Sequence, residues 1–378
     1  MLLVSRLRTA VKLRLRADSL MYNALAWTFG LITKRLEPWQ RFNKFNRFLV
    51  QVRRLILPFR IEHISGPLAV KAAIDDLVAA CVVRNGARYI QSFLEHHRSL
   101  GIRHFIFLDN GSTDNTLSLL SDKQNVTVLR SFAPYRTYEN VMKRYLVERF
   151  CRERWCLFVD IDELFDYPLS RDLPLKQLLR YLKHYNFNCV ITQMLDMFSA
   201  DNSAKTEGFS SRLIKEQYRM YDLSHIRKER YWQYVPNKRI MWYWGGIRNQ
   251  VFGTKNGLTK ISLFCLERSF VPFVEWHHAT GTRIADVTAV LLHFPFVESF
   301  YEKVRDAVEM GRYGYQVDDE YRAYLRGLTE KELPAFPVST ARSLDCVDDL
   351  LESDFLVVSE NYINWIAGHG RVTNRCLE

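Results

Sequence analysis

The chain has 378 residues, of which 48% are hydrophobic and 13% aromatic, so it can bury a large core and is not intrinsically disordered. Residues 1–60 carry thirteen Lys and Arg against two acidic residues and account for the whole net charge of +11. The neutral remainder argues against a protein that binds polyanions over its whole surface.

The first 70 residues form a basic N-terminal arm. Within residues 2–16, the apolar side chains share one helical face and most basic ones the other. This pattern is typical of a helix lying on an anionic membrane, and a basic helix packed on the rest of the chain explains it equally well. The uncharged run Ser19–Thr33 is shorter than the roughly 20 apolar residues of a spanning helix.

The seven cysteines are scattered through the chain, and no two have CxxC spacing. Such a set indicates reduced thiols in the core and favours a reducing compartment. We therefore predict a cytoplasmic protein, attached peripherally to the inner face of the membrane if the arm binds lipid.

Strands and helices alternate along the body of the chain. In chain order we predict a strand at Leu77–Val83, a helix at Arg88–Leu100, a strand at Phe105–Leu108, a short helix capped by Ser112 or Thr113, a strand at Val126–Leu129, a helix at Tyr138–Phe150, a strand at Cys156–Val159, a helix at Leu175–Tyr185 and a strand at Cys189–Leu195. The alternation predicts an α/β fold with a mixed, mainly parallel sheet and flanking helices.

The pattern weakens from about residue 212 to 273, where aromatic residues are dense. Aromatic side chains of this kind either stack on sugar rings or fill a core. A helix is predicted at Val297–Arg312, and residues 313–378 form a mostly helical C-terminal extension. The central unit thus covers residues 71–312.

The strongest local motif is Asp160-Ile161-Asp162 at the end of an apolar strand. Carboxylates at i and i+2 of an extended chain point the same way, which suits a hard cation with oxygen ligands. Acid-x-acid triplets are common by chance, but this one lies about fifty residues after a second acidic turn.

The second turn runs from Asp109 to Thr116. An Asp at a strand end can accept hydrogen bonds from a nucleobase or ribose, while Gly111 lets the backbone approach a ligand. An ordinary Asx turn followed by a helix cap is sufficient for the segment Asn110–Asp114 in isolation, but the presence of both motifs favours a ligand site. In a parallel sheet, the loops of Arg84, Asp109 and Asp160 should converge on one crevice.

With these motifs in order, residues from about 77 to 310 resemble the family 2 glycosyltransferases of the GT-A fold. The later segments Gly245-Gly246-Ile247-Arg248, Lys260, His277-His278 and Leu291-Leu292-His293-Phe294 also resemble motifs of this group. The first motif of the group corresponds to Val82-Val83-Arg84-Asn85, and the chain departs from it at the next position, where Gly86 replaces the usual acidic residue.

The resemblance implies a nucleotide-sugar donor and Mn²⁺ or Mg²⁺ as cofactor. Asp109 would contact the nucleoside, Asp160 the ribose or metal, and Asp162 the metal. His293 is the preferred further metal ligand and His278 the second choice. Arg84, Arg248 and Lys260 are donor-binding candidates, although surface ion pairs explain the last two equally well.

An inverting transfer requires a carboxylate that accepts the proton of the acceptor hydroxyl. The candidates are Glu275, beside Trp276-His277-His278, and Asp196, at the end of the strand after the metal triplet.

The leading hypothesis is a metal-dependent glycosyltransferase that acts on a polysaccharide or glycolipid acceptor at the membrane surface. A non-catalytic module that binds nucleotide-sugars is the first alternative, which Gly86 permits. A nucleic-acid-binding protein, suggested only by the basic arm, is the second, and the neutral body argues against it.

Overall fold

The computed structural model describes residues 38–70, 76–200, 213–274, 278–328, 335–336 and 338–370. The predicted amphipathic segment at residues 2–16 and the uncharged run Ser19–Thr33 lie outside these ranges, as does Glu275.

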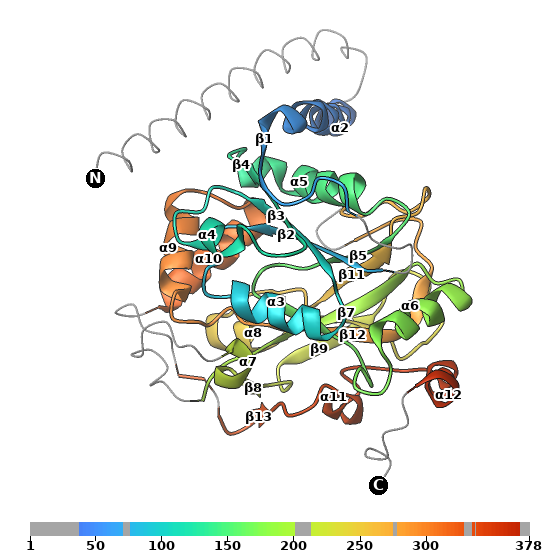
Figure 1. The fold of residues 1–378 in the computed structure, drawn as a ribbon. Coiled ribbons are helices and arrows are strands. Elements are labelled where there is room, and N and C mark those ends of the chain that lie inside the picture. Colours follow the sequence, from blue (N-terminus) through green and yellow to red (C-terminus); the bar gives the residue numbers. More distant parts are fainter. Residues whose placement is uncertain are drawn as a thin grey trace.

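A single large sheet organises the described part of the chain (Figure 1). Its six strands of common direction are β4, β3, β2, β5, β7 and β12, and the remaining three run antiparallel to their neighbours. In spatial order the strands are β1 (Ile61–Ser65), β4 (Val126–Ser131), β3 (His104–Asp109), β2 (Val78–Val83), β5 (Trp155–Phe158), β11 (Thr259–Cys265), β7 (Cys189–Asp196), β12 (Ile284–His293) and β6 (Glu163–Asp166). The predicted mixed, mainly parallel sheet is therefore confirmed.

Both faces of this sheet are buried. In β2, Ala79, Cys81 and Val83 belong to one core cluster, while the alternate residues of the same strand belong to the other. The period of two explains why these strands are almost continuously apolar in sequence, since each successive side chain enters a different core.

Helices cover the two faces. Figure 1 shows α2 and α5 on one side of the sheet and α3 and α6 on the other. The helices are α2 (Pro38–Ile56), the 3₁₀ turn η1 (Leu57–Arg60), α3 (Ile90–Ser99), α4 (Thr116–Leu120), α5 (Tyr135–Phe150), α6 (Leu175–His184), α7 (Ile214–Gln217), α8 (Ile247–Phe252), α9 (Phe300–Glu309), α10 (Tyr315–Gly327), α11 (Asp349–Glu352) and α12 (Glu360–His369).

The aromatic-rich segment contains an antiparallel hairpin of β9 (Ile226–Arg230) and β10 (Met241–Gly245). Tyr231 and Trp242 pack into one core cluster and Tyr243 into the other, while Trp232 and Tyr234 are exposed. A short pair, β8 (Met220–Tyr221) with β13 (Arg342–Ser343), joins this region to the C-terminal extension.

Two details differ from the sequence prediction. The helix after the Asp109 turn begins only at Thr116, and Asp114 rather than Ser112 or Thr113 accepts from its first backbone N–H. The antiparallel strands β6 and β11 were not predicted, because β6 has only four residues and β11 lies in the segment where the hydrophobic pattern is weak.

Six cysteines lie within the described residues as free thiols, and four of them are buried. None of the helices in the described ranges combines the length and the apolar character needed to cross a bilayer.

The C-terminal extension contributes to the main core. Val347, Leu350, Phe355, Leu356 and Tyr362 all belong to the cluster that also contains α3 and α6 side chains. The Tyr362 hydroxyl donates to the Pro168 carbonyl over 2.8 Å. The extension is thus packed as part of the folded body.

This packing predicts that Leu350→Ala lowers the free energy of unfolding of the whole protein by about 2–5 kcal/mol, because Leu350 is fully buried. Ile363→Ala, on the 44% exposed Ile363 of α12, should change it by only about 0.5 kcal/mol. Urea denaturation followed by tryptophan fluorescence measures both. Equal effects of the two substitutions would show that the extension is not part of the cooperative core.

Candidate active site

The predicted site residues gather at one edge of the sheet. The carboxyl ends of the parallel strands and the amino ends of antiparallel β6 and β11 meet there. The residues brought to this edge are Arg84 after β2, Asp109 ending β3, Asp160 after β5, Asp196 ending β7, His293 ending β12, Glu163 beginning β6 and Lys260 near the start of β11.

The link that carries the acidic triplet crosses this edge. Strands β5 and β6 are consecutive in sequence but are separated in the sheet by β11, β7 and β12. Residues 159–162 must therefore pass over the ends of the three intervening strands. This crossing brings Asp160 to Lys260 of β11 and Asp162 to His293 of β12.

A chain of polar contacts connects Asp162 to the interior. His293 Nδ1 lies 2.6 Å from Asp196 Oδ1, and His293 Nε2 lies 3.7 Å from Asp162 Oδ2. The other oxygen of Asp196 accepts from Arg248 Nε over 2.7 Å. The Asp162 carboxylate also accepts from Lys303 Nζ over 2.7 Å. Asp196 thereby orients the imidazole with its second nitrogen toward Asp162.

A second cluster holds Asp160. Lys260 Nζ donates to the two oxygens of Glu163 over 2.6 and 2.7 Å and to Asp160 Oδ2 over 3.3 Å. Glu163 also accepts from the Asp160 backbone N–H. The Glu163 and Lys260 side chains are almost fully buried, whereas the Asp160 side chain is 40% exposed. The buried pair thus fixes the link and leaves the Asp160 carboxylate partly exposed to solvent.

The charges at this edge shift one another strongly. Burial alone would raise the pKa of Asp162, but Lys303 and His293 outweigh it and hold this pKa well below its ordinary value. Burial likewise lowers the pKa of His293, but the Asp162 and Asp196 carboxylates, which face its two ring nitrogens, reverse the effect and raise this pKa to about 9. The site therefore holds Asp162 as an anion beside cationic partners.

The donor set suits a divalent cation only in part. Across the described ranges, no three His, Cys, Asp or Glu side chains gather closely enough to hold a metal ion by themselves. Asp162 and His293 supply an oxygen and a nitrogen directed at one another, and Asp160 lies two residues away. Any cation held by these residues would therefore have to take most of its ligands from elsewhere.

The Asp109 turn is closed by its own backbone. The fully buried Asp109 carboxylate accepts from the N–H groups of Gly111 and Ser112 and lies 3.3 Å from Arg130 Nε. Arg84 Nη1 donates to the carbonyls of Asn110 and Gly111. The contacts of Asp109 form an Asx turn. The hydrogen bonds of Arg84 join the loop after β2 to the loop after β3, and we call the place where these two loops meet the rim.

Gly86 is explained by sterics. A Cβ atom at this position would lie 2.6 Å from Val83 Cγ2 and 2.9 Å from Ile161 Cγ1. Ile161 is the middle residue of the acidic triplet, so the loop after β2 supports the crossing link by direct contact. The absence of an acidic side chain at Gly86 thus follows from this close approach.

The other candidates lie elsewhere or outside the described residues. The His278 ring packs 5.0 Å from the Trp232 ring and 5.1 Å from the Trp242 ring, which places it beside the β9–β10 hairpin. Glu275 lies outside the described residues. Two residues of the site have no role assigned from the sequence. Glu163 belongs to the acidic motif, whereas Lys303 follows Asp162 by 141 positions and carries no local signal.

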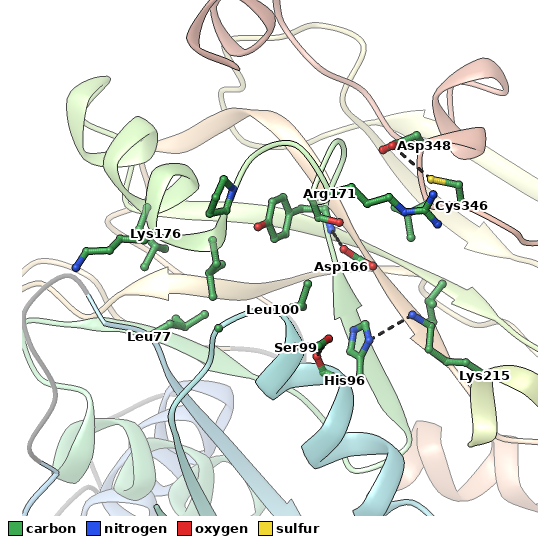
Figure 2. A pocket seen from close by; sticks show the side chains of 18 of the residues that line it. Leu77, His96, Ser99, Leu100, Asp166, Arg171, Lys176, Lys215, Cys346 and Asp348 are labelled. Atoms are coloured by element: carbon green, nitrogen blue, oxygen red, sulfur yellow. Dashed lines mark hydrogen bonds between the residues drawn. The ribbon is translucent and has the colours of Figure 1, made fainter. Parts of the chain in front are cut away.

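A separate cavity of about 750 Å³ lies between α3, α6, α7 and the C-terminal extension. Its lining includes none of the predicted site residues. Figure 2 shows Lys215 directed at His96, whose Nδ1 lies 3.3 Å from Lys215 Nζ. Burial lowers the pKa of His96 to about 3, so its ring is neutral and accepts from Lys215. The chemistry predicted above is therefore not located in this cavity.

Comparison with known proteins gives distant structural similarities only. No family model matches the sequence, and no curated protein matches it. A crystal structure of S. aureus TarS is 17% identical, with a TM-score of 0.23, over 33% of this chain and 22% of that chain. The structure of S. aureus TarS 1-349 is 15% identical, with a TM-score of 0.29, over 67% of this chain and 70% of that chain. At TM-scores this low, a function has to be argued from the site geometry.

The contact between Gly86 and Ile161 predicts that Gly86→Ala lowers the free energy of unfolding by about 1–3 kcal/mol, because the added methyl group overpacks two β-branched side chains. Gly368→Ala is the matched control, since a Cβ atom meets nothing within 4 Å there and the residue lies in α12. It should stabilise the protein by up to about 1 kcal/mol. Chemical denaturation compares the two, and a neutral Gly86→Ala would contradict the proposed support of the triplet.

Proposed function

We propose that the protein is a nucleotide-sugar-dependent glycosyltransferase of the GT-A type, similar to family 2. The observation that carries this proposal is the crossing link, which sets Asp160 and Asp162 over the carboxyl edge of the sheet beside His293. In open α/β sheets this edge is where ligands bind, because the loops that leave the strands line a crevice there.

The charges of the edge suit a sugar nucleotide. Arg84 lies on the rim at the ends of β2 and β3, and Lys303 reaches Asp162 from α9 with its side chain 34% exposed. These cations can pair with a diphosphate, and the Asp109 loop remains our candidate contact for the nucleoside. Lys260 is engaged by Glu163 and Asp160, and Arg248 by Asp196, so we assign both to holding the site rather than to binding the donor.

We assign Asp162 and His293, with Asp160, as the residues that hold Mn²⁺ or Mg²⁺. When bound, such a cation stabilises the charge that develops on the leaving diphosphate. Asp196 Oδ1 accepts from His293 Nδ1, so Nε2 is the nitrogen that would bind the cation, once it has released the proton that it carries beside Asp162. Asp162 is kept ionised by its cationic neighbours, which is the form that a metal ligand requires.

In the proposed transfer, the bond between the anomeric carbon and the diphosphate oxygen breaks, and the acceptor hydroxyl oxygen bonds to that carbon. The hydroxyl proton passes to a carboxylate base. Both oxygens of Asp196 are engaged, one with His293 and one with Arg248, which favours a positioning role for Asp196 over proton transfer. Glu275 remains our candidate for the base.

A polysaccharide or glycolipid acceptor is our proposal for the second substrate. Trp232 is 58% exposed and Tyr234 is 85% exposed at the turn of the β9–β10 hairpin, and the other end of the hairpin leads through Gly245 and Gly246 to α8 with Arg248. Exposed aromatic rings of this kind stack on sugar rings. The hairpin is therefore our candidate surface for an extended saccharide.

This proposal predicts that Asp162→Asn lowers the transfer rate by at least about 100-fold, because the substitution removes the anionic ligand. A panel of nucleotide-sugars is first screened by thermal shift with and without Mn²⁺, and release of the nucleoside diphosphate is then measured for the best ligand. Asp345→Asn, at an exposed ion pair with Arg219, is the control and should leave the rate unchanged. Binding without release in the wild type would favour a non-catalytic nucleotide-sugar module, and full activity of Asp162→Asn would remove the metal role.

We also propose peripheral contact with an anionic membrane. Leu55 on α2 is 72% exposed and Phe59 on η1 is 92% exposed. η1 leads directly into β1, where Ile61 pairs with Ser131 at the carboxyl end of β4, so Phe59 lies at the same sheet edge as the acidic triplet. Together with the excess of Lys and Arg in residues 1–60, this apolar pair suits an anionic lipid surface.

The membrane proposal predicts that the double variant Leu55→Ser/Phe59→Ser binds vesicles containing phosphatidylglycerol at least about tenfold more weakly than the wild type, since two apolar side chains no longer enter the interface. Sedimentation with vesicles measures the difference, and pure phosphatidylcholine vesicles test the dependence on charge. Tyr234→Ser removes an equally exposed aromatic residue from the hairpin and should have no effect. Equal binding by all variants would exclude α2 and η1 as the contact.

A further inference from the structure

Each carboxylate of the acidic triplet is paired with a lysine, and the two lysines differ. Lys260 is buried and makes three hydrogen bonds to Glu163 and Asp160. Lys303 has a side chain that is 34% exposed, and within the described residues its one hydrogen-bond acceptor is Asp162, at 2.7 Å. Lys260 is thus part of the framework, whereas Lys303 can leave its position at the cost of one contact.

The Asp162 carboxylate needs a cation at all times. Its side chain is only 7% exposed, so water cannot solvate the charge, and an unpaired buried carboxylate is strongly unfavourable. A divalent cation bound to Asp162 Oδ2 and the Lys303 ammonium would compete for the same oxygen. If the metal arrives alone, Lys303 is left beside a like charge and without an anion.

The balance changes when a diphosphate enters with the metal. The diphosphate brings two or more negative charges. Because Asp162 already offsets one of the two positive charges of the metal, the metal neutralises the diphosphate only in part. Lys303 can then exchange the Asp162 oxygen for a phosphate oxygen, because its long side chain extends from α9 at the surface of the site. The two cations no longer compete, since each has an anionic partner.

We propose that Lys303 is the resident counter-ion of Asp162 and makes cation binding conditional on a diphosphate. The inference rests on the proposed function, because it takes Asp162 as a metal ligand. It assigns to Lys303 a positioning role: the residue opposes the metal in the empty site and pairs with the diphosphate in the loaded one.

The test measures Mn²⁺ binding to the nucleotide-free protein. Binding is monitored by the loss of the free Mn²⁺ signal in electron paramagnetic resonance. Lys303→Met keeps an unbranched side chain of similar length but removes the charge, and it should bind Mn²⁺ about 10- to 100-fold more tightly than the wild type, as expected for the loss of one competing charge-assisted hydrogen bond. Lys303→Arg should behave like the wild type.

Two further variants make the test specific. Arg305→Met removes a charge from the same helix, where Arg305 lies 3.9 Å from Glu309 and not at Asp162, and it should leave Mn²⁺ binding unchanged. Asp162→Asn in the Lys303→Met background should abolish the gained binding. Thermal unfolding of each variant verifies that it is folded.

The outcomes separate this inference from the proposed function. Equal or weaker Mn²⁺ binding by Lys303→Met, with binding still abolished by Asp162→Asn, overturns the role of Lys303 and leaves the metal site standing. No Mn²⁺ binding by any variant, even with saturating nucleotide-sugar from the thermal-shift panel, overturns the metal site and this inference together. If Arg305→Met also binds Mn²⁺ more tightly than the wild type, the gain reflects the general positive charge of α9 and not the contact between Lys303 and Asp162. That result would overturn the role of Lys303.

Discussion

A carboxylate at the buried end of a sheet has to be neutralised where it lies, because the surrounding core offers no water to solvate it. The edge described above meets this requirement with a row of alternating charges. Arg248, Asp196, His293, Asp162 and Lys303 follow one another, each in contact with the next. The arrangement fixes the imidazole and keeps Asp162 ionised, and the candidate chemistry depends on both properties.

The sheet topology makes this row possible. Because β11, β7 and β12 lie between β5 and β6, the segment that joins two consecutive strands must span the carboxyl edge. The side chains of residues 160 and 162 therefore meet Lys260 of β11 and His293 of β12, together with Lys303 of α9. Glu163 then enters β6 and anchors the link through Lys260.

The elements outside the sheet have separable roles. The C-terminal extension is packed into the main core, whereas Lys303 on α9 closes the row of charges at the site. The hairpin β9–β10 exposes Trp232 and Tyr234 at its turn, and α2 with η1 exposes Leu55 and Phe59. Buried packing thus serves stability, and the exposed aromatic and apolar side chains are left for the two proposed partners, a saccharide and a lipid surface.

By itself, the sequence determined the alternation of strands and helices, the mixed and mainly parallel sheet, and the edge at which Arg84, Asp109 and Asp160 would meet. Strands buried on both faces are continuously apolar, so they can be recognised in the sequence, and the polar residues that directly follow them mark the edge of the sheet. Only the tertiary structure decided the partners of those residues. The insertion of β11 between β5 and β7, the addition of β6 beside β12, the contact of Gly86 with Ile161 and the pairing of Lys303 with Asp162 all join positions far apart in the chain. No local pattern encodes such contacts.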